Sequence, residues 1–414
     1  MGRIIGIDLS KGGNCAMLMG GDPIVISGIN GGGLVPSPIM IIKEKKEKDG
    51  IDGKVWSHEE QLGLYLLNIK KNAEKRLGET VSEAVISIPA HFSYEHCQSV
   101  YNAAKIAGIN IKRFVMDTSA VALSLFKESL EQSILCVVLK ESYLDIGVVN
   151  IGDGVFEEWA VGSCKLPVNH VEEIENMIKN SLKDSGLSGS ELGEIIVCGE
   201  DDIITDISNL IKQVIPNKTI RLIPKDSIAL GASVQAGKLD GSEGVGDILL
   251  LQLIPYELSI RTEGNDTTTI IGKYDYTIPT KKTKQISTSK DNQSEMEILV
   301  YADDLLSGRI KLDQIEHAKK GEPKIEVTID SDANAIINAY VRNMKTNHSR
   351  HITLQAVNEI ADEDAERSRA YLEGFLSGQM TRQEQGVIFE DGAKSVLNQL
   401  LPIIDNFDRA IDTA

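Results

Sequence analysis

The stretch that decides the fold is ILCVVLKESYLDIGVVNIGDGVFEEWAV, residues 134–161. It contains three apolar runs with strand character, separated by two turns, and the second turn carries Gly152 and Asp153. The stretch therefore predicts an antiparallel meander of three strands. In its first turn, LKESYLD, every residue from Lys140 to Asp145 has a side chain, whereas a glycine-rich turn would let backbone N–H groups approach an anion.

The same pattern occurs at the N-terminus, in RIIGIDLSKGGNCAMLMGGDPIVISG, residues 3–28. Each meander is followed by a run of alternating strands and helices. For the first half we expect a strand at 83–89, a helix at 93–107, a strand at 111–116 and a helix at 118–126. For the second half we expect helices at 168–184, 202–215 and 226–239, and strands at 193–199 and 219–223. This internal duplication predicts two mixed sheets with helices outside and ligand-binding turns facing a cleft.

The pattern changes after the acidic, glycine-rich segment 241–247 and the apolar tetrad ILLL at 248–251. Up to about residue 353, Thr, Ile and Val alternate with charged residues, which is typical of an all-β sandwich. Helical spacing returns from Glu359 onward, in EDAERSRAYLEGFL and GAKSVLNQLLPIIDNFDRAID. Pro402 would weaken or kink the second of these helices.

The composition excludes several classes of partner. The chain has 414 residues and a formal net charge of -18, which opposes binding to nucleic acids or anionic membranes. No signal-peptide pattern precedes the first strand, and no apolar run approaches the roughly 20 residues of a membrane span. The five cysteines are scattered without metal-site spacing, so we expect reduced cysteines, no metal and a cytoplasmic protein.

Several stretches resemble the DnaK-type heat-shock chaperones. They are GRIIGIDL (2–9), EAVISIPAHFSYEHCQSVYNAAKIAGINIKRFVMDTSAVAL (83–123), PKDSIALGASVQAGKL (224–239), YTIPTKKTKQISTSKDNQSEMEILVY (276–301) and PKIEVTIDSDANAIIN (323–338). The resemblance implies an actin-like, duplicated ribonuclease-H-like ATPase core at 1–240 that lacks most of both peripheral lobes. It further implies a linker at 241–252, a peptide-binding β-sandwich at 253–355 and a helical tail at 356–414.

The resemblance also assigns positions in a nucleotide cleft. Asp8 is kept, Asp117 stands where the family has a glutamate, and Asp145 stands at the aspartate of the second phosphate loop, so these three are the candidate catalytic residues. The cofactor-binding candidates by position are Gly6, Lys11, Gly12, Gly13 and Gly199. The alternative for the three aspartates is that they cap turns and helix starts.

Both phosphate loops depart from the family pattern. The first reads DLSKGGN where the family has DLGTTNS, and the second reads VLKESYLD where the family has DLGGGTFD. Side chains on Lys140, Glu141 and Ser142 would fill the space of a β-phosphate, and the charge of Glu141 adds repulsion of about 1 kcal/mol or more.

The lobes that carry the family's catalytic lysine and clamp adenosine are almost absent, at 41–60 and 161–174. The remaining adenosine turn is Cys198-Gly199-Glu200-Asp201-Asp202, in which acids replace an arginine and two hydroxyl residues. We therefore expect no cofactor, with Mg-ATP remaining an option only for an atypical site.

The resemblance places an apolar peptide pocket in the β-sandwich. Its residues would be Leu258, Ile260, Met296 and Ile298, with Glu263 and Ser289 arching over the peptide. Capture in such a site depends on backbone hydrogen bonds to an extended chain and one apolar pocket. The alternative is that the apolar residues merely fill a sandwich core.

The C-terminal segment FEDGAKSVLNQLLPIIDNFDRAID, residues 389–412, is similar to the helical core of GrpE-type nucleotide exchange factors. We take the GrpE-like part to begin at about residue 386. The resemblance implies a dimeric helical bundle and hence a homodimer. An intramolecular helical lid on the β-sandwich is the alternative.

Three functional hypotheses follow. The first is a DnaK-like chaperone or chaperone-system adaptor that binds unfolded or extended polypeptides without normal ATP hydrolysis, with a DnaK or GrpE-type cochaperone as a further expected partner. The second is an ATP-dependent chaperone ATPase with an atypical phosphate site, in which Lys11 or Lys140 replaces the missing lysine. The third is a non-catalytic scaffold or oligomerisation protein.

Overall fold

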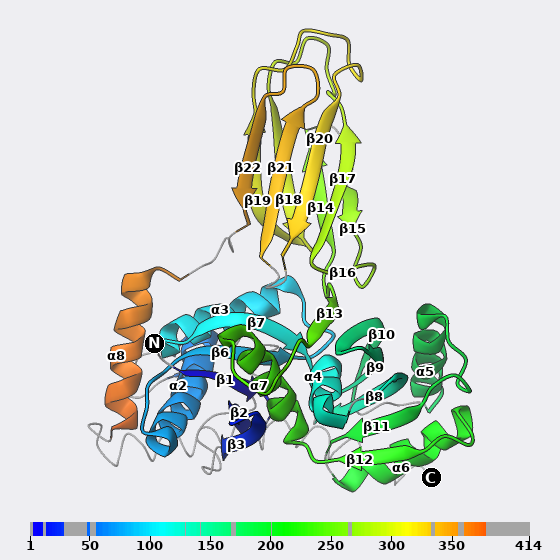
Figure 1. The fold of residues 1–414 in the computed structure, drawn as a ribbon. Coiled ribbons are helices and arrows are strands. Elements are labelled where there is room, and N and C mark those ends of the chain that lie inside the picture. The colour runs from blue at the N-terminus through cyan, green and yellow to red at the C-terminus, as the bar shows by residue number, and fades with distance from the viewer. Residues whose placement is uncertain are drawn as a thin grey trace, which may run out of the picture.

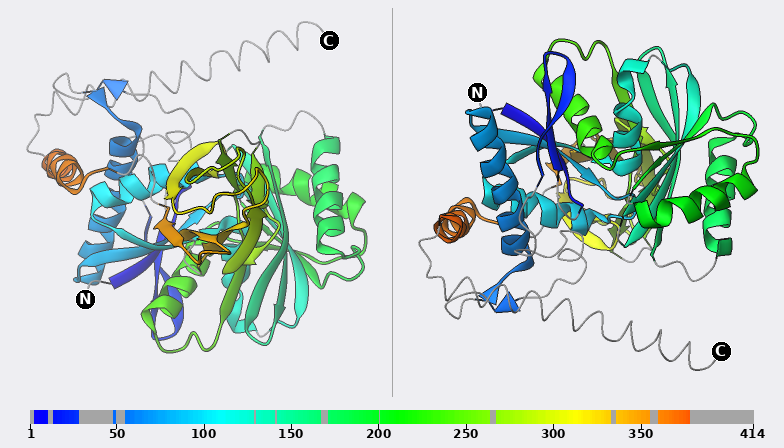
Figure 2. Two further views of the ribbon diagram at one scale, coloured as in Figure 1. Left: turned by 90° about the horizontal axis from the view of Figure 1, so that it is seen from above. Right: turned by 90° about the horizontal axis from the view of Figure 1, so that it is seen from below.

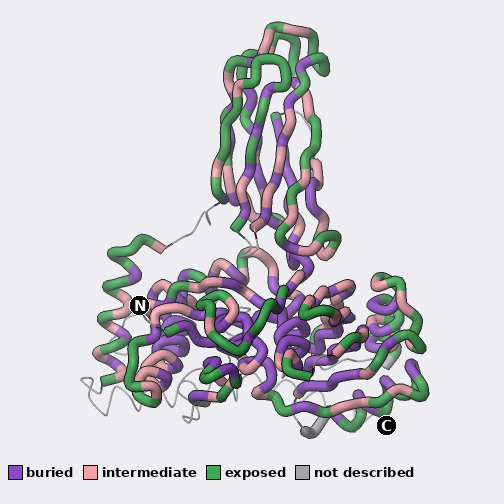
Figure 3. The backbone as a smooth tube through the Cα atoms, in the orientation of Figure 1, coloured by how far each residue is buried: buried purple, intermediate pink, exposed green. Residues whose placement is uncertain are grey.

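A computed structural model describes residues 3–10, 14–28, 48–49, 55–128, 130–140, 142–166, 171–199, 201–263, 267–332, 336–354 and 360–377. Two α/β sheets with their helices form a broad base, and a tall β-sandwich stands on it (Figure 1). Figure 2 shows the sandwich end-on from above, over the junction between the two halves of the base. Buried residues run through the middle of both parts, which indicates separate cores (Figure 3).

The first sheet has the strand order β3-β2-β1-β6-β7. Its strands are β1 (Arg3–Asp8), β2 (Asn14–Met19), β3 (Asp22–Gly28), β6 (Val81–Ile88) and β7 (Asn110–Met116). The helices α2 (His58–Leu77) and α3 (Tyr94–Ala107) pack on each other and share one apolar core with the sheet. Helix α2 begins at a capping box of Ser57 and Glu60 and ends at Gly78, whose φ of 70° is left-handed. A short pair, β4 (Lys48–Asp49) and β5 (Val55–Trp56), precedes α2.

The second sheet has the order β12-β11-β8-β9-β10-β13-β16. Its strands are β8 (Gln132–Lys140), β9 (Tyr143–Gly152), β10 (Val155–Lys165), β11 (Glu194–Cys198), β12 (Ile220–Ile223), β13 (Leu249–Leu253) and β16 (Thr277–Ile278). Helices α4 (Asp117–Leu123), α5 (Val171–Ser185) and α6 (Asp201–Val214) pack with this sheet, and a 3₁₀ turn, η2, spans Phe126–Glu128. Helix α7 (Ser227–Asp240) packs on β1 and β2 of the first sheet and on α4.

The two sheets confirm the internal duplication. The strands β3-β2-β1 and β10-β9-β8 are both antiparallel meanders, and each is extended by two parallel strands on the far side of its first strand. The expected strands and helices of both halves are present, with ends that differ from the expected positions by a few residues. The sequence period alone therefore predicted the topology.

The apolar tetrad expected in a linker is largely a strand of the second sheet. β13 pairs in parallel with the start of β10, with Val155 opposite Leu249 and Glu157 opposite Leu251. β16, which precedes the main strands of one sandwich sheet, pairs with the end of β13. The segment between the base and the sandwich is thus held by backbone hydrogen bonds to the base.

The sandwich consists of two four-stranded antiparallel sheets, in the orders β15-β14-β18-β19 and β17-β20-β21-β22. The strands are β14 (Leu258–Thr262), β15 (Thr268–Ile271), β17 (Thr280–Ile286), β18 (Met296–Ala302), β19 (Leu305–Leu312), β20 (Ile325–Ser331), β21 (Ile337–Asn343) and β22 (Ser349–Thr353). In β20, buried and half-buried residues alternate, as expected for a strand with one face in a core. The all-β prediction for this region is confirmed.

The last described helix, α8 (Asp362–Leu376), packs on α2 and α3 of the base and not on the sandwich (Figure 1). The Trp56 ring makes edge contacts with Tyr371 and Phe375, at centroid distances of 6.1 Å and 5.6 Å. The GrpE-like segment 389–412, together with its expected dimerisation or lid role, lies outside the described residues. Among the helices described, none is long and apolar enough to cross a membrane.

Candidate functional site

Three predicted carboxylates meet where the two sheets face each other. Asp8 ends β1, Asp117 begins α4 directly after β7, and Asp145 lies near the start of β9. All three residues are at most 1% exposed. The duplication explains this meeting, because the ends of corresponding strands in the two halves face the same cleft.

Lys140 occupies the position between two of these carboxylates. Its Nζ lies 2.7 Å from Asp8 Oδ1 and 2.7 Å from Asp117 Oδ2, and its side chain is only 6% exposed. Tyr143, from the same turn, donates a hydrogen bond of 2.7 Å to Asp117 Oδ2. The turn that replaces the second phosphate loop therefore places a cation and a hydroxyl donor inside the cleft.

The electrostatics keep this cation charged. Burial by itself lowers the pKa of Lys140, but the carboxylates of Asp117 and Asp8 more than offset that effect, so its pKa is raised above the ordinary value. Burial and the nearby carboxylates raise the pKa of Tyr143 well above its ordinary value, so the phenol remains a hydrogen-bond donor. The cluster is a buried ion-pair triad whose geometry is set by protein groups alone.

Asp145 differs from the other two aspartates in its hydrogen-bond partner and in its pKa. Its Oδ2 accepts a 2.9 Å hydrogen bond from the backbone N–H of Ala90. Burial, followed by the charge of Asp117, raises its pKa to about 7. The buried atoms Asp117 Oδ1 and Asp145 Oδ1 have no hydrogen-bond partner in the described part of the chain. The structure thus brings the three aspartates together, but only Asp8 and Asp117 contact Lys140.

This arrangement does not fit Mg-ATP. A nucleotide cleft needs free carboxylates to organise Mg²⁺ and small residues around the phosphates. Here Lys140 holds the carboxylates of Asp8 and Asp117, and the buried Tyr143 ring stands where the phosphate loop has a threonine. A magnesium ion would have to displace an ammonium that is already desolvated and paired.

The predicted cofactor-binding glycines have packing roles. A Cβ on Gly6 would come within 2.2 Å of the Ser233 backbone in α7, and one on Gly199 would come within 2.7 Å of Leu139 Cβ. Each glycine lets two elements approach closely. Lys11, Gly12, Gly13 and Glu141 lie outside the described residues.

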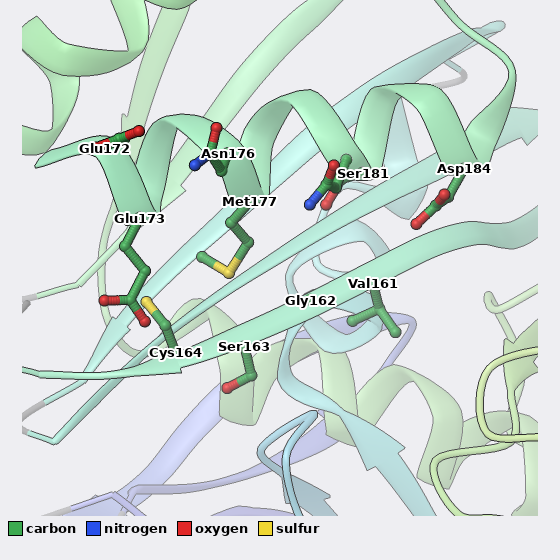
Figure 4. Close-up of a pocket in the computed structure, with 11 residues that line it drawn as sticks. Val161, Gly162, Ser163, Cys164, Glu172, Glu173, Asn176, Met177, Ser181 and Asp184 are labelled. Carbon is green, nitrogen blue, oxygen red and sulfur yellow. The ribbon is translucent and has the colours of Figure 1, made fainter. Parts of the chain in front are cut away.

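A cavity of about 530 Å³ lies between β10 and α5, where the chain passes directly from strand to helix without the adenosine lobe. Its lining includes three carboxylates, those of Glu172, Glu173 and Asp184. Figure 4 shows Glu173 and Met177 extending from α5 toward Cys164 on β10. Burial raises the pKa of the Cys164 thiol to about 11, so it is a poor nucleophile. The acidic lining disfavours a nucleotide.

Glu158, on β10, joins helix α4 to strand β13. Its Oε1 accepts hydrogen bonds from Thr118 and Ser119 on α4, at 2.7 Å and 3.1 Å, and its Oε2 accepts one of 3.3 Å from the Leu253 N–H. Burial raises its pKa to about 7. The buried Arg113 donates to the Leu250 carbonyl, at 3.1 Å. Helix α4, which carries Asp117, is therefore connected to β13 through the Glu158 carboxyl group, and also through Gln252, which accepts a 2.8 Å hydrogen bond from the Met116 N–H just before the helix.

The sandwich has its own cavity, of about 380 Å³. Two predicted peptide-site residues, Ile260 and Ser289, line it. The predicted pocket residues Leu258, Met296 and Ile298 are 0%, 3% and 0% exposed and belong to the sandwich core. The predicted arch residue Glu263 forms a 2.6 Å ion pair with Lys290, which follows Ser289.

Other lining residues were not predicted. They are Thr262, Thr268, Ile286, Ser287, Thr288, Lys320 and Gly321. Three of them, Ile286, Ser287 and Thr288, form a continuous run with Ser289 in the sequence, ISTS, which begins at the last residue of the edge strand β17.

The cavity lies beside the free edges of both sandwich sheets. β15 and β17 are each the outermost strand of their sheet, and β17 is paired on one side only, with β20. The Lys284 ammonium spans the two edges by donating a 2.7 Å hydrogen bond to the Thr269 carbonyl. Edge strands offer unpaired N–H and C=O groups to an added extended chain.

The chain matches the family described as Hsp70 protein over residues 4–163 and 164–400. These ranges cover far more than half of its length, and the chain therefore belongs to the Hsp70 family. Membership confirms the DnaK-type resemblance, implies an actin-like core for the duplicated base, and supports a chaperone-type function.

Proposed function

We propose that this Hsp70-family protein binds extended polypeptides in its sandwich without normal ATP hydrolysis. The observation that carries the proposal is the position of Lys140 Nζ, 2.7 Å from both Asp8 and Asp117. The ammonium supplies the positive charge that these carboxylates would otherwise receive from a metal ion. The chain itself thereby fills the cleft and supplies a cation between the two carboxylates.

The free energy of the buried ion pairs favours a cleft occupied by Lys140 over a cleft occupied by a nucleotide. Removing one partner of a buried ion pair costs about 3–5 kcal/mol, because a charge remains buried without compensation. Mg-ATP would have to replace the contacts of Lys140 with Asp8 and Asp117 and also accommodate Tyr143. The adenosine lobe that would contribute binding energy is missing from the sequence.

Three features support polypeptide binding. The lining of the sandwich cavity includes residues of the edge strands β15 and β17, the apolar side chains of Ile260 and Ile286, and the hydroxyl groups of five Ser and Thr residues. Main-chain hydrogen bonds to an edge, with a side chain in an adjacent pocket, are a recurring way to hold an extended chain.

The ion-pair triad would also fix the relation between base and sandwich. Lys140 from the second half holds two carboxylates of the first half, while Glu158 and Arg113 hold β13. The carboxylate of Asp303, in the sandwich, accepts a 3.0 Å hydrogen bond from the N–H of Tyr94 at the start of α3. It accepts a second one, also of 3.0 Å, from the N–H of Glu257. We infer that the sandwich stays docked without a nucleotide cycle, as suits a holdase or an adaptor.

A binding assay on the full chain tests this function. Fluorescence anisotropy with a panel of labelled extended peptides, acidic, apolar and basic, should give saturable binding to at least one class. The variant Ile286→Asp, which places a charge on the cavity floor, should weaken that binding, whereas Ile24→Asp on the exposed face of β3 should not. If no peptide binds at about 100 µM protein, the scaffold hypothesis replaces the holdase.

A further inference from the structure

The sandwich cavity is lined mainly by polar side chains. Only two of its lining residues, Ile260 and Ile286, are apolar. The hydroxyl-bearing lining residues are Thr262, Thr268, Ser287, Thr288 and Ser289. Ser287 and Ser289 already donate to the Pro323 carbonyl and to Gln293 Oε1, whereas the buried Thr288 Oγ1 has no hydrogen-bond partner in the described part of the chain. An aliphatic side chain that enters this cavity would leave this hydroxyl group without compensation.

In the part of the sandwich that the structure describes, the apolar side chains beneath this lining are packed against one another, and Ile260 itself is only 1% exposed. The three apolar residues expected there, Leu258, Met296 and Ile298, are at most 3% exposed and pack in the sandwich core. A leucine side chain of a bound segment would therefore contact Ile260 and Ile286 but would find no larger apolar pocket behind them. The geometry gives little reason for strong preference toward leucine.

One cation lines the cavity and is not neutralised. The Lys320 ammonium makes no ion pair within the described part of the chain, and the nearby Asp291 binds the Lys320 backbone N–H instead, at 2.8 Å. The neighbouring Lys290 differs, since its charge is paired with Glu263. Lysines along β17 add positive charge to the edge beside the cavity. One of them, Lys281, is paired, since its Nζ lies 3.4 Å from Asp330 Oδ2.

We propose that the sandwich selects extended segments that carry an acidic side chain at the position entering the cavity. The carboxylate is recognised by the Lys320 ammonium and by the Thr288 hydroxyl, while the backbone of the segment lies along the edge of the sheet. This inference rests on the proposed function, polypeptide binding at the cavity, and adds the chemical class of the segment.

The test uses three labelled peptides that are identical except for a central Glu, Leu or Lys in a common Val/Ser/Gly background. With the full chain, the Glu peptide should bind about fivefold or more tightly than the Lys peptide, and more tightly than the Leu peptide. Raising the salt concentration from about 50 to about 300 mM should lower the binding affinity of the Glu peptide appreciably and leave the affinities of the other two peptides nearly unchanged.

Two variants locate the effect. Lys320→Gln should lower the affinity for the Glu peptide about two- to fivefold and leave that for the Leu peptide unchanged. Lys319→Gln is the matched control, because this residue is adjacent but does not line the cavity. Both positions are exposed, so the melting temperature should be unchanged in each variant.

The outcomes separate the two proposals. If the Leu peptide binds most tightly and Lys320→Gln has no effect, the acidic preference is wrong while polypeptide binding stands. If Lys319→Gln and Lys320→Gln weaken the Glu peptide equally, the preference belongs to the loop charge and not to the cavity. If none of the three peptides binds, polypeptide binding itself fails.

Discussion

The ammonium of Lys140, carried by the second α/β unit, lies 2.7 Å from the carboxylate of Asp8 at the end of the first strand of the first unit. Both side chains are almost completely buried, and Asp117 completes the cluster at the same distance. A turn that corresponds to a phosphate loop by position has thus become the source of the cation in the cleft. The predictions below test what this contact does for stability and binding.

Replacing Lys140 by methionine should destabilise the protein by about 3–5 kcal/mol, because Asp8 and Asp117 would be left as buried, uncompensated charges. Urea denaturation followed by circular dichroism measures this. The control Lys179→Met removes an exposed ion pair with Glu175 in α5 and should cost about 0.5 kcal/mol or less. A Lys140→Met variant as stable as the control would show that the ion-pair triad is not formed.

The Tyr143→Phe substitution should cost about 1.5–3 kcal/mol, because it removes one hydrogen bond to the buried carboxylate of Asp117 and no ring packing. The midpoint of urea unfolding should fall while the slope stays constant. Combining this change with Asp117→Asn should give less than the sum of the two separate losses. Strict additivity would contradict direct contact between the two groups.

Stability should fall as pH rises through neutrality. Asp145 and Glu158 have pKa values raised from 3.8 and 4.5 to about 7, so between these limits the folded protein retains protons that the unfolded chain has released. Between pH 5 and pH 8 we expect a loss of about 2–3 kcal/mol from each of these two groups. Lys140 adds no dependence in this window, because its raised pKa keeps it charged.

The double variant Asp145→Asn, Glu158→Gln checks this assignment. Its unfolding free energy should vary less with pH than that of the unsubstituted protein. Glu158→Gln should also increase hydrogen exchange at Leu253, since the amide cannot accept from that N–H while its oxygen accepts from Thr118 and Ser119. An unchanged pH profile would mean that both carboxyl groups are charged at pH 6.

Arg369 should hold α8 on the base. Its guanidinium donates to the carbonyls of Ile106 and Lys105 at the C-terminal end of α3, at 2.8 Å and 2.7 Å. Arg369→Ala should loosen α8 and expose Trp56, shifting its fluorescence to the red; Trp159→Phe in the background leaves Trp56 as the only tryptophan. Arg367→Ala, which removes an exposed contact with Asp364, should leave the spectrum unchanged.

The sequence predicted the duplicated architecture because the same spacing of strands, turns and helices occurs twice. The resemblance to the DnaK-type family assigned Asp8, Asp117 and Asp145 to one cleft, and in the structure the three side chains lie together where the two sheets face each other. The sequence did not predict which cation would lie between Asp8 and Asp117. A lysine in a turn has many accessible rotamers, and only the packed cleft determines that Lys140 points inward.

The sandwich was predicted less completely. Alternation in segments such as KIEVTID specifies which residues face a core, but it does not specify which strands end at a sheet edge. Consequently Ile260 and Ser289 were placed at the cavity, whereas Leu258, Met296 and Ile298 proved to be core residues, and Lys320, from a distant loop, was missed. The dimer expected from residues 389–412 remains a prediction for light scattering on a chain lacking 386–414.

The most direct test of the central claim is a titration of the unsubstituted protein with Mg-ATP, followed by thermal unfolding. A ligand at 100 times its Kd stabilises a folded protein by about 2.7 kcal/mol, an effect that is easily seen. Because Lys140 already occupies the position between Asp8 and Asp117, we predict no saturable shift up to several millimolar Mg-ATP. A saturable shift with a sub-millimolar Kd would contradict the account and favour an ATPase with an atypical phosphate site.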